Sequence, residues 1–270
     1  MKKLLCVVGG IIILVIGCGK GERASIMSHI AFHWDTPDSF VKTAVVEGYK
    51  YNGFKIIPVT TINEDTLYPK IYGFDPTYFY YEAYVNWIDE GEECKFKIDY
   101  DEGKGEATGT MPGEFRITSP DTTYVLHKGS ALNITWNSSN GANWYWLDVY
   151  LDYYYVDTSG SWDSYYFELD TIVDGTSLTI SASRIFPNYV DSVSWGYGEV
   201  FIEAINGPKP EPGAKSNIKG DAVGFFWCVY DAKSITFGIE NLLAMPRANR
   251  QTEIRKRHYE VLREFALENE

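Results

Sequence analysis

The stretch Cys94-Lys-Phe-Lys-Ile-Asp-Tyr-Asp101 alternates apolar and charged side chains without interruption. Successive side chains of a β-strand point to opposite faces, so this alternation predicts a strand with one face on a core and the other in water. Residues 79–87 repeat the pattern, and residues 40–46 and 54–62 indicate further strands between Gly, Asn and Pro residues. From about residue 28 onward the period is two, which predicts an all-β fold.

A second series of strands follows Thr110-Met-Pro-Gly-Glu114, where Phe115-Arg-Ile-Thr-Ser-Pro120 opens a new run. Its predicted strands cover residues 124–126, 131–136, 144–156, 161–173, 177–181, 200–206 and 225–230. About seven short strands at this spacing indicate a two-sheet sandwich. We therefore place a domain boundary near Gly113 and expect two consecutive antiparallel β-sandwich domains, residues 28–113 and 114–240.

Part of the second unit resembles the immunoglobulin-like module of bacterial surface proteins, and also the Ser/Thr-rich, GPI-anchored cell-wall family of fungi. The residues that carry the resemblance are Ile117-Thr-Ser-Pro120, Gly129, Leu132-Asn-Ile-Thr-Trp136 and Ser177-Leu-Thr-Ile-Ser181. The resemblance covers residues 115–239 and implies two packed sheets with Trp136 in the core. The paired cysteines of antibody domains are absent, so the resemblance implies no disulfide and no binding loop.

Composition narrows the classes of partner. The chain has 270 residues, 45% of them hydrophobic, which is enough for a sizeable core in one or two domains. Its formal net charge is −13. Nucleic-acid binding depends on a basic surface that neutralises phosphates, so nucleic acid is excluded as a partner.

The first residues indicate export. Lys2 and Lys3 precede an uninterrupted apolar or small run from Leu4 to Gly17, which Cys18 follows at once. This ending resembles the lipobox of bacterial lipoproteins, although Ile16 is bulkier than the usual Ala or Ser. The resemblance implies a signal peptide at 1–17, a lipidated tether at 18–27, and a protein that is exported and lipid-anchored in the bacterial cell envelope, with the membrane as a partner. The alternative is an uncleaved N-terminal anchor helix.

The end of the chain has a different character from the strands. Residues 248–270 contain no Pro or Gly, and their apolar residues Ile254, Val261, Leu262 and Phe265 fit a short amphipathic helix. We expect a C-terminal helical appendage at 241–270. Cys94 and Cys228, the cysteines of the folded part, lie in apolar strand patterns. Two separate buried thiols are favoured over one disulfide.

An aromatic and acidic strand face is the candidate ligand-binding site. In residues 144–156 one set of alternate side chains suits a core, and the other set should face outward. Across a hairpin, residues 161–173 add further members to that outward face. Trp and Tyr interleaved with carboxylates suit the stacking of sugar rings and the acceptance of hydroxyl protons. The predicted ligand-binding residues are Trp144, Trp146, Asp148, Tyr150, Asp152, Tyr154, Trp162 and Tyr166.

Two alternatives to this binding face remain open. The face could be buried against the first domain or a partner, or its cross-strand aromatic pairs could merely stabilise an exposed hairpin. The carboxylates of the same face allow a further reading, a glycan hydrolase that uses paired acids. Its candidate acids are Asp148, Asp152, Glu168 and Asp170.

No catalytic residue, metal ligand or cofactor site is predicted. The sequence has no nucleophile-elbow pattern, and no histidine lies near a recognisable Ser or Cys motif. His29 and His33 are four positions apart, which on a strand is about 13 Å, too far to share one ion. We expect a non-catalytic envelope lipoprotein with a binding, adhesion or structural role, whose partner is a glycan or a surface protein.

Lipidation at Cys18 is testable directly. Radiolabelled palmitate should enter the wild-type chain in a bacterial host and should not enter Cys18→Ser, because the thiol is the atom that would be acylated. Equal labelling of the two chains would show that the anchor assignment is wrong.

Overall fold

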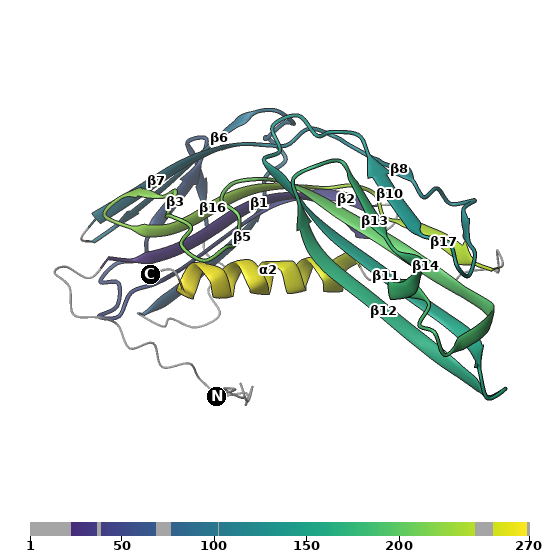
Figure 1. Ribbon diagram of the computed structural model, residues 1–270. Coiled ribbons are helices and arrows are strands. Elements are labelled where there is room, and N and C mark those ends of the chain that lie inside the picture. Colours follow the sequence, from purple (N-terminus) through teal and green to yellow (C-terminus); the bar gives the residue numbers. More distant parts are fainter. Residues whose placement is uncertain (1–22, 37–38, 69–76, 102, 241–250, 269–270) are drawn as a thin grey trace.

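The computed structural model describes residues 23–36, 39–68, 77–101, 103–240 and 251–268. Strands dominate, and one long helix, α2, lies at the C-terminal end of the chain (Figure 1). The predicted all-β class with a C-terminal helix is therefore confirmed. The predicted signal peptide and Cys18 lie outside the described residues. None of the helices in the described ranges is long and apolar enough to cross a bilayer.

The strands form two sandwiches. In the first, β1 (Ser25–Thr36), β2 (Ser39–Tyr49), β5 (Tyr78–Tyr84) and β16 (Val223–Asp231) face β3 (Val59–Ile62), β4 (Asp65–Leu67), β6 (Glu93–Tyr100), β7 (Gly103–Thr110) and β15 (Lys219–Gly220). In the second, β9 (Val125–Leu126), β11 (Trp144–Asp157), β12 (Trp162–Val173), β14 (Val190–Asn206) and β17 (Ile235–Ile239) face β8 (Ile117–Ser119), β10 (Leu132–Trp136) and β13 (Ser177–Ile180). The helices are α1 (Ala182–Ile185) and α2 (Gln251–Glu268).

The second sandwich has the packing that the immunoglobulin-like resemblance implies. A three-stranded sheet, in the order β13-β10-β8, covers the sheet that contains β11, β14 and β17. Trp136 is buried between the two layers, and its ring packs edge-on against Tyr145 at 5.5 Å between centroids. The aromatic side chain therefore fills the core as expected for such a module.

Strand β14 joins the two sandwiches into one sheet. Its residues 196–200 pair with β17, whereas residues 203–206 pair with β16. Strand β16 then pairs in parallel with β1, so the sheet runs in the order β12-β11-β14-β16-β1-β2-β5. A strand of 17 residues is long enough to serve both partners.

The course of β15 and β16 differs from the single boundary predicted near Gly113. Residues 219–231 lie beyond that boundary in sequence, yet they pair with β7 and β1 of the first sandwich. The run Phe225-Phe-Trp-Cys-Val-Tyr230 is apolar at every position and is buried throughout. Such a run is typical of a central strand covered on both faces, which is the place that β16 takes beside β1.

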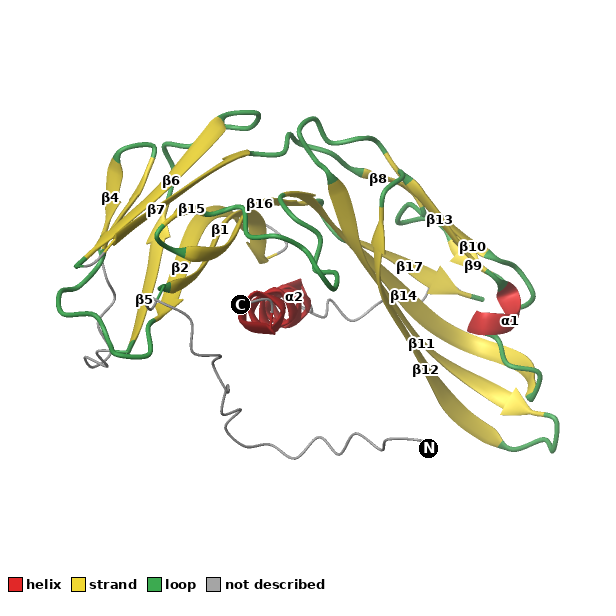
Figure 2. Ribbon diagram, turned by 60° about the vertical axis from the view of Figure 1, so that its left-hand side comes forward, coloured by secondary structure: helices red, strands yellow, loops and turns green. Residues whose placement is uncertain are grey.

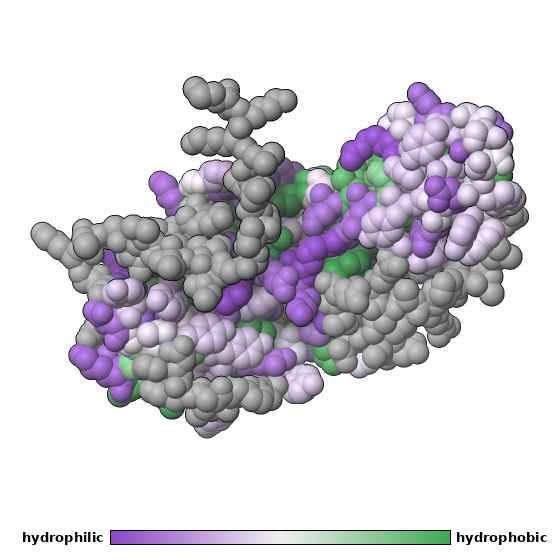
Figure 3. All heavy atoms as spheres, turned by 90° about the horizontal axis from the view of Figure 1, so that it is seen from below, coloured by the Kyte–Doolittle hydropathy of each residue, from purple (hydrophilic) through white to green (hydrophobic). Residues whose placement is uncertain are grey.

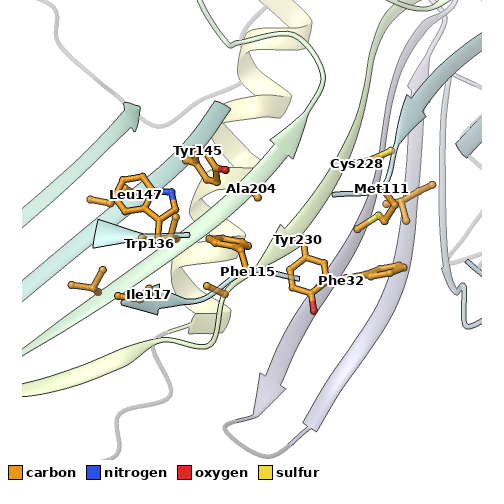
Figure 4. Close-up of a cluster of buried hydrophobic side chains, with 14 of the residues drawn as sticks. Phe32, Met111, Phe115, Ile117, Trp136, Tyr145, Leu147, Ala204, Cys228 and Tyr230 are labelled. Carbon is orange, nitrogen blue, oxygen red and sulfur yellow. The ribbon is translucent and has the colours of Figure 1, made fainter. Parts of the chain in front are cut away.

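The hydrophobic core is also continuous between the sandwiches. Figure 4 shows a row of aromatic rings that passes from Trp136 and Tyr145 through Phe115 to Tyr230 and Phe32. The ring of Phe115 lies 5.7 Å from that of Tyr145 and 6.2 Å from that of Tyr230, between centroids. Phe115, which opens the second run of strands in the sequence, thus contacts residues of both units.

Cys94 and Cys228 are both buried free thiols. Burial, together with the neighbouring thiol of Cys94, raises the pKa of Cys228 well above its usual range. The two cysteines are therefore not joined in a disulfide, as the sequence favoured, and both contribute to the apolar core.

The sheet is bent into an arch, and α2 lies in the hollow of the arch between its two arms (Figure 2). Leu262, Phe265 and Ala266 of the helix are buried against Met27, Trp227 and other apolar residues of the sheet. The helix was expected to be an appendage, but it covers the concave face.

The shared sheet predicts that the two units stabilise each other. Residues 114–240 alone would expose the edge of β16 and the Phe115–Tyr230 contact. We expect this fragment to melt at least about 10 °C below the full chain, because 1 kcal/mol shifts the melting temperature of a 100-residue domain by about 4–8 °C. Circular dichroism measures both transitions. Equal melting temperatures would mean that the second unit folds independently.

Candidate functional site

The candidate face is formed by β11, β12 and β14, whose register places its side chains in rows. Asp148 lies opposite Asp170, and Tyr154 lies opposite Trp195. This is the concave face on which α2 lies. The helix covers one part of the face and leaves the other part open. The covered part contains Trp144, Trp146, Asp148 and Asp170. The open part contains Tyr154, Trp162, Tyr166 and Trp195.

The covered part contradicts the expectation that the whole row faces solvent. Trp144, Trp146, Asp148 and Tyr150 are all buried, and Trp146 retains only 3% of its exposure. The two tryptophans belong to the apolar cluster that includes Leu262 and Phe265 of the helix. The ring of Trp146 stacks on that of His258 at 4.2 Å between centroids. The helix therefore buries the tryptophans that were predicted to stack on a ligand.

His258 of α2 lies at the centre of a polar cluster under the helix. Its Nδ1 lies 2.8 Å from Glu203 Oε2, and its Nε2 lies 2.5 Å from Asp148 Oδ2. Desolvation by burial opposes a charge on the ring. The charge of Glu203, with the hydrogen bonds to Asp148 and Glu203, outweighs it and raises the pKa of His258 to about 10. At neutral pH the ring is an imidazolium that donates to a carboxylate from each nitrogen.

Arginines of the helix complete the cluster. Arg257 donates to Asp148 Oδ1 at 2.7 Å and forms an ion pair with Glu168. Arg255 lies 3.7 Å from Asp231. Burial of this carboxyl group raises its pKa well above the usual range. The basic residues near the start of α2 thus contact acidic residues of the sheet. Three of the acids proposed for a hydrolase, Asp148, Glu168 and Asp170, form ion pairs with the helix.

The polar contact between helix and sheet extends to the first sandwich. Arg263 donates to Glu47 of β2 at 2.7 Å, and the hydroxyl of Tyr78 of β5 donates to the same carboxylate at 2.7 Å. Desolvation by burial, together with the charge of Arg255, lowers the pKa of His29 to about 4. His29 is therefore neutral at physiological pH, and its ring contacts that of Tyr259 at 4.9 Å.

The open part keeps its aromatic rings accessible. The exposed fractions are 69% for Trp162, 53% for Tyr166, 43% for Tyr154 and 39% for Trp195. The rings of Tyr154 and Trp195 lie 4.7 Å apart at an interplanar angle of 33°. Seen from below, the end of the molecule that carries this hairpin is coloured mostly in the pale tones of intermediate hydropathy (Figure 3).

Carboxylates lie between these rings, as the sequence predicted. The hydroxyl of Tyr166 donates a hydrogen bond to Glu168 at 2.6 Å, and the hydroxyl of Tyr150 donates one to Asp152 at 3.3 Å. The ring of Tyr150 packs at 4.6 Å against that of Tyr166. These hydrogen bonds and ring contacts hold the hydroxyls and rings in fixed positions, which lowers the entropy that a ligand would have to remove.

Comparisons with known proteins identify no family for the chain. No family model and no curated protein matches it. Among solved structures, the fibronectin(III)-like modules of CbhA from Clostridium thermocellum align with 79% of this chain and 92% of theirs, at 10% identity and a TM-score of 0.28. A similarity at that level supports no conclusion about function.

The burial of the tryptophans can be measured by truncation. Trp144→Ala and Trp146→Ala should each lower the free energy of unfolding by about 3–5 kcal/mol, the range for large aromatic side chains in cores. Trp162→Ala on the same hairpin should change it by about 0.5 kcal/mol or less, since its ring faces solvent. Urea unfolding compares the three variants. If Trp146→Ala is as mild as Trp162→Ala, the helix does not cover this face in solution.

Proposed function

We propose that the protein is a non-catalytic binding protein of the bacterial envelope, anchored through Cys18, that recognises a glycan on its open aromatic part. One observation carries this proposal. Tyr154, Trp162, Tyr166 and Trp195 expose their rings together on one sheet face, although exposed aromatic clusters are uncommon on monomeric proteins.

The chemistry of this surface suits a carbohydrate. Sugar rings present flat C–H faces that pack on Trp and Tyr, and their hydroxyls donate to carboxylates. The open part combines both, because Asp152 and Glu168 lie beside Tyr150 and Tyr166. A strand scaffold holds these side chains more rigidly than a loop would. Such a surface suits a binding, adhesion or structural role, as expected from the sequence.

The position of the proposed anchor fits this role. The described fold begins at residue 23, shortly after Cys18. Residues 25–27 of the expected tether 18–27 belong to β1 instead, so only the short segment between Cys18 and Ser25 would hold the first sandwich close to the membrane. The β11–β12 hairpin belongs to the other arm of the arch (Figure 1). Its rings would be available to a ligand outside the membrane.

A glycan array tests the proposal with matched tryptophan variants. The full chain in a non-ionic detergent should bind a defined group of glycans. Trp162→Ala and Trp195→Ala should each weaken that binding at least about tenfold, since a buried aromatic contact in an interface contributes about 1.4 kcal/mol or more. Trp87→Ala is the control, because Trp87 is 43% exposed and lies outside this face.

Two results would contradict the proposal. One is the absence of any glycan binding by the wild-type chain. The other is an equal loss of binding in the Trp87→Ala control, which would place the contact elsewhere. The melting temperatures of all variants should stay close to that of the wild type, so that weaker binding reflects lost contacts and not unfolding.

A further inference from the structure

Three side chains from three separate elements converge under α2. Asp148 of β11 and Asp170 of β12 lie opposite each other in the sheet, and His258 reaches them from the helix. One carboxylate oxygen of each aspartate and one ring nitrogen of His258 all lie within 4.8 Å of one another. His258 Nε2 is 2.5 Å from Asp148 Oδ2 and 3.9 Å from Asp170 Oδ2.

Each of these three groups forms a hydrogen bond with a different residue through its other oxygen or nitrogen atom. Arg257 donates to Asp148 Oδ1, and the indole N–H of Trp146 donates to Asp170 Oδ1. Glu203 accepts from His258 Nδ1 at 2.8 Å. His258 Nε2 is thus left facing the two Oδ2 atoms at 2.5 and 3.9 Å, and Arg257 Nε also lies 3.9 Å from Asp170 Oδ2. A carboxylate that orients a histidine through its far nitrogen is the usual support of a metal-ligating imidazole.

A fourth carboxylate provides an independent observation. Asp231 is fully buried, lies directly opposite Glu203 in the sheet, and neither of its oxygens accepts a hydrogen bond. Its nearest cation is Arg255, at 3.7 Å. Five carboxylates gather here, Asp148, Glu168, Asp170, Glu203 and Asp231, against the three cations Arg255, Arg257 and protonated His258. Carboxyl groups therefore outnumber cationic side chains in a poorly solvated place, which favours the binding of a further cation there.

We propose that Asp148, Asp170 and His258 bind a divalent transition-metal ion of the Zn²⁺ type, which ties α2 to the sheet. Imidazole nitrogen with carboxylate oxygens suits Zn²⁺ better than Ca²⁺ or Mg²⁺, which prefer oxygen ligands alone. Ligand atoms around tetrahedral Zn²⁺ lie about 3.3 Å apart, given bonds of about 2.0–2.2 Å. The separations of 2.5 and 3.9 Å bracket that value, so small side-chain movements are sufficient.

Water can complete the coordination. The side chain of Asp170 is 34% exposed, so one side of the cluster is open to solvent, whereas Asp148 and His258 are buried. The ion enters from that side and displaces the proton from His258 Nε2 when it binds. The site links β11, β12 and α2, so an ion there would add a bond between the helix and the sheet.

Zinc titration of the full chain in detergent, after removal of metal with a chelator, tests the site. Calorimetry should show one Zn²⁺ per chain with a dissociation constant below about 10 μM, a free energy of about 7 kcal/mol. Hydrogen exchange of the α2 amides should slow when Zn²⁺ is present, because the ion holds the helix on the sheet.

Asp170→Asn is the decisive variant. An asparagine Oδ1 still accepts from Trp146, but the charged Oδ2 is lost. Zinc binding should weaken at least thirtyfold, and Zn²⁺ should no longer slow the exchange of the α2 amides. Asp163→Asn, an exposed position on the same strand, is the control and should bind as the wild type does.

Other outcomes would overturn the proposal. One is that the wild type binds no Zn²⁺ up to about 1 mM. Another is that Asp170→Asn binds Zn²⁺ as tightly as the wild type, which would place the ion at another site such as a thiol. If Asp170→Asn melts well below the wild type without metal, Co²⁺ takes the place of Zn²⁺ in the wild type. Visible absorption bands of tetrahedral Co²⁺ support the site, and their absence overturns it.

Discussion

The double pairing of β14 is the constraint on which the rest of the architecture depends. One end of this strand pairs with β17 and the other with β16, so the same sheet must enter both sandwiches. A twisted sheet that is shared in this way bends, and its two arms enclose a concave face (Figure 2). The concave face is apolar at its centre, where Trp144, Trp227 and Phe225 gather, and it would be a large exposed patch without a cover. The helix α2 supplies that cover.

The contact between α2 and the sheet combines apolar burial with buried charges, and the two contributions have different consequences. Leu262, Phe265 and Ala266 provide the area that holds the helix on the sheet. The ion pairs of Arg257, His258 and Arg263 contribute less net stability, since desolvation offsets much of their attraction. They do fix the position of the helix along the sheet, because a shift by one turn would separate Asp148, Glu203 and Glu47 from their partners on the helix. We infer that the charged residues determine where the helix lies along the sheet, whereas the apolar residues determine how strongly it binds to the sheet.

Local patterns in the sequence predicted the strands and missed the contacts made over long distances. The alternation at residues 93–100 appears in β6 as strict alternation of exposed and buried side chains. Trp136 lies in the core, as its place in the resemblance implied. The prediction that this face of β11 is exposed was wrong for the part that α2 covers. Alternation shows which side chains share a face, but it does not show what covers that face. The cover comes from a helix more than a hundred residues away in the sequence, and so does His258. Trp195 was missed because the sequence predicted this strand only from residue 200, whereas β14 begins at Val190 and its register places Trp195 opposite Tyr154 on the aromatic face.

The parallel pairing of β1 with β16 bears on how the chain folds while it is being made. Ser25 pairs with Val223, and Phe32 with Tyr230, so β1 is synthesised long before the strand with which it pairs. Until β16 has emerged, one edge of β1 is unpaired and the first sandwich lacks a central strand, an arrangement that favours wrong association with other chains. Because β16 follows β14 in the sequence, most of the second sandwich has already emerged when the gap is filled. The first sandwich is therefore completed only after most of the second has been synthesised. Until then, β1 must be kept from pairing with strands of other chains.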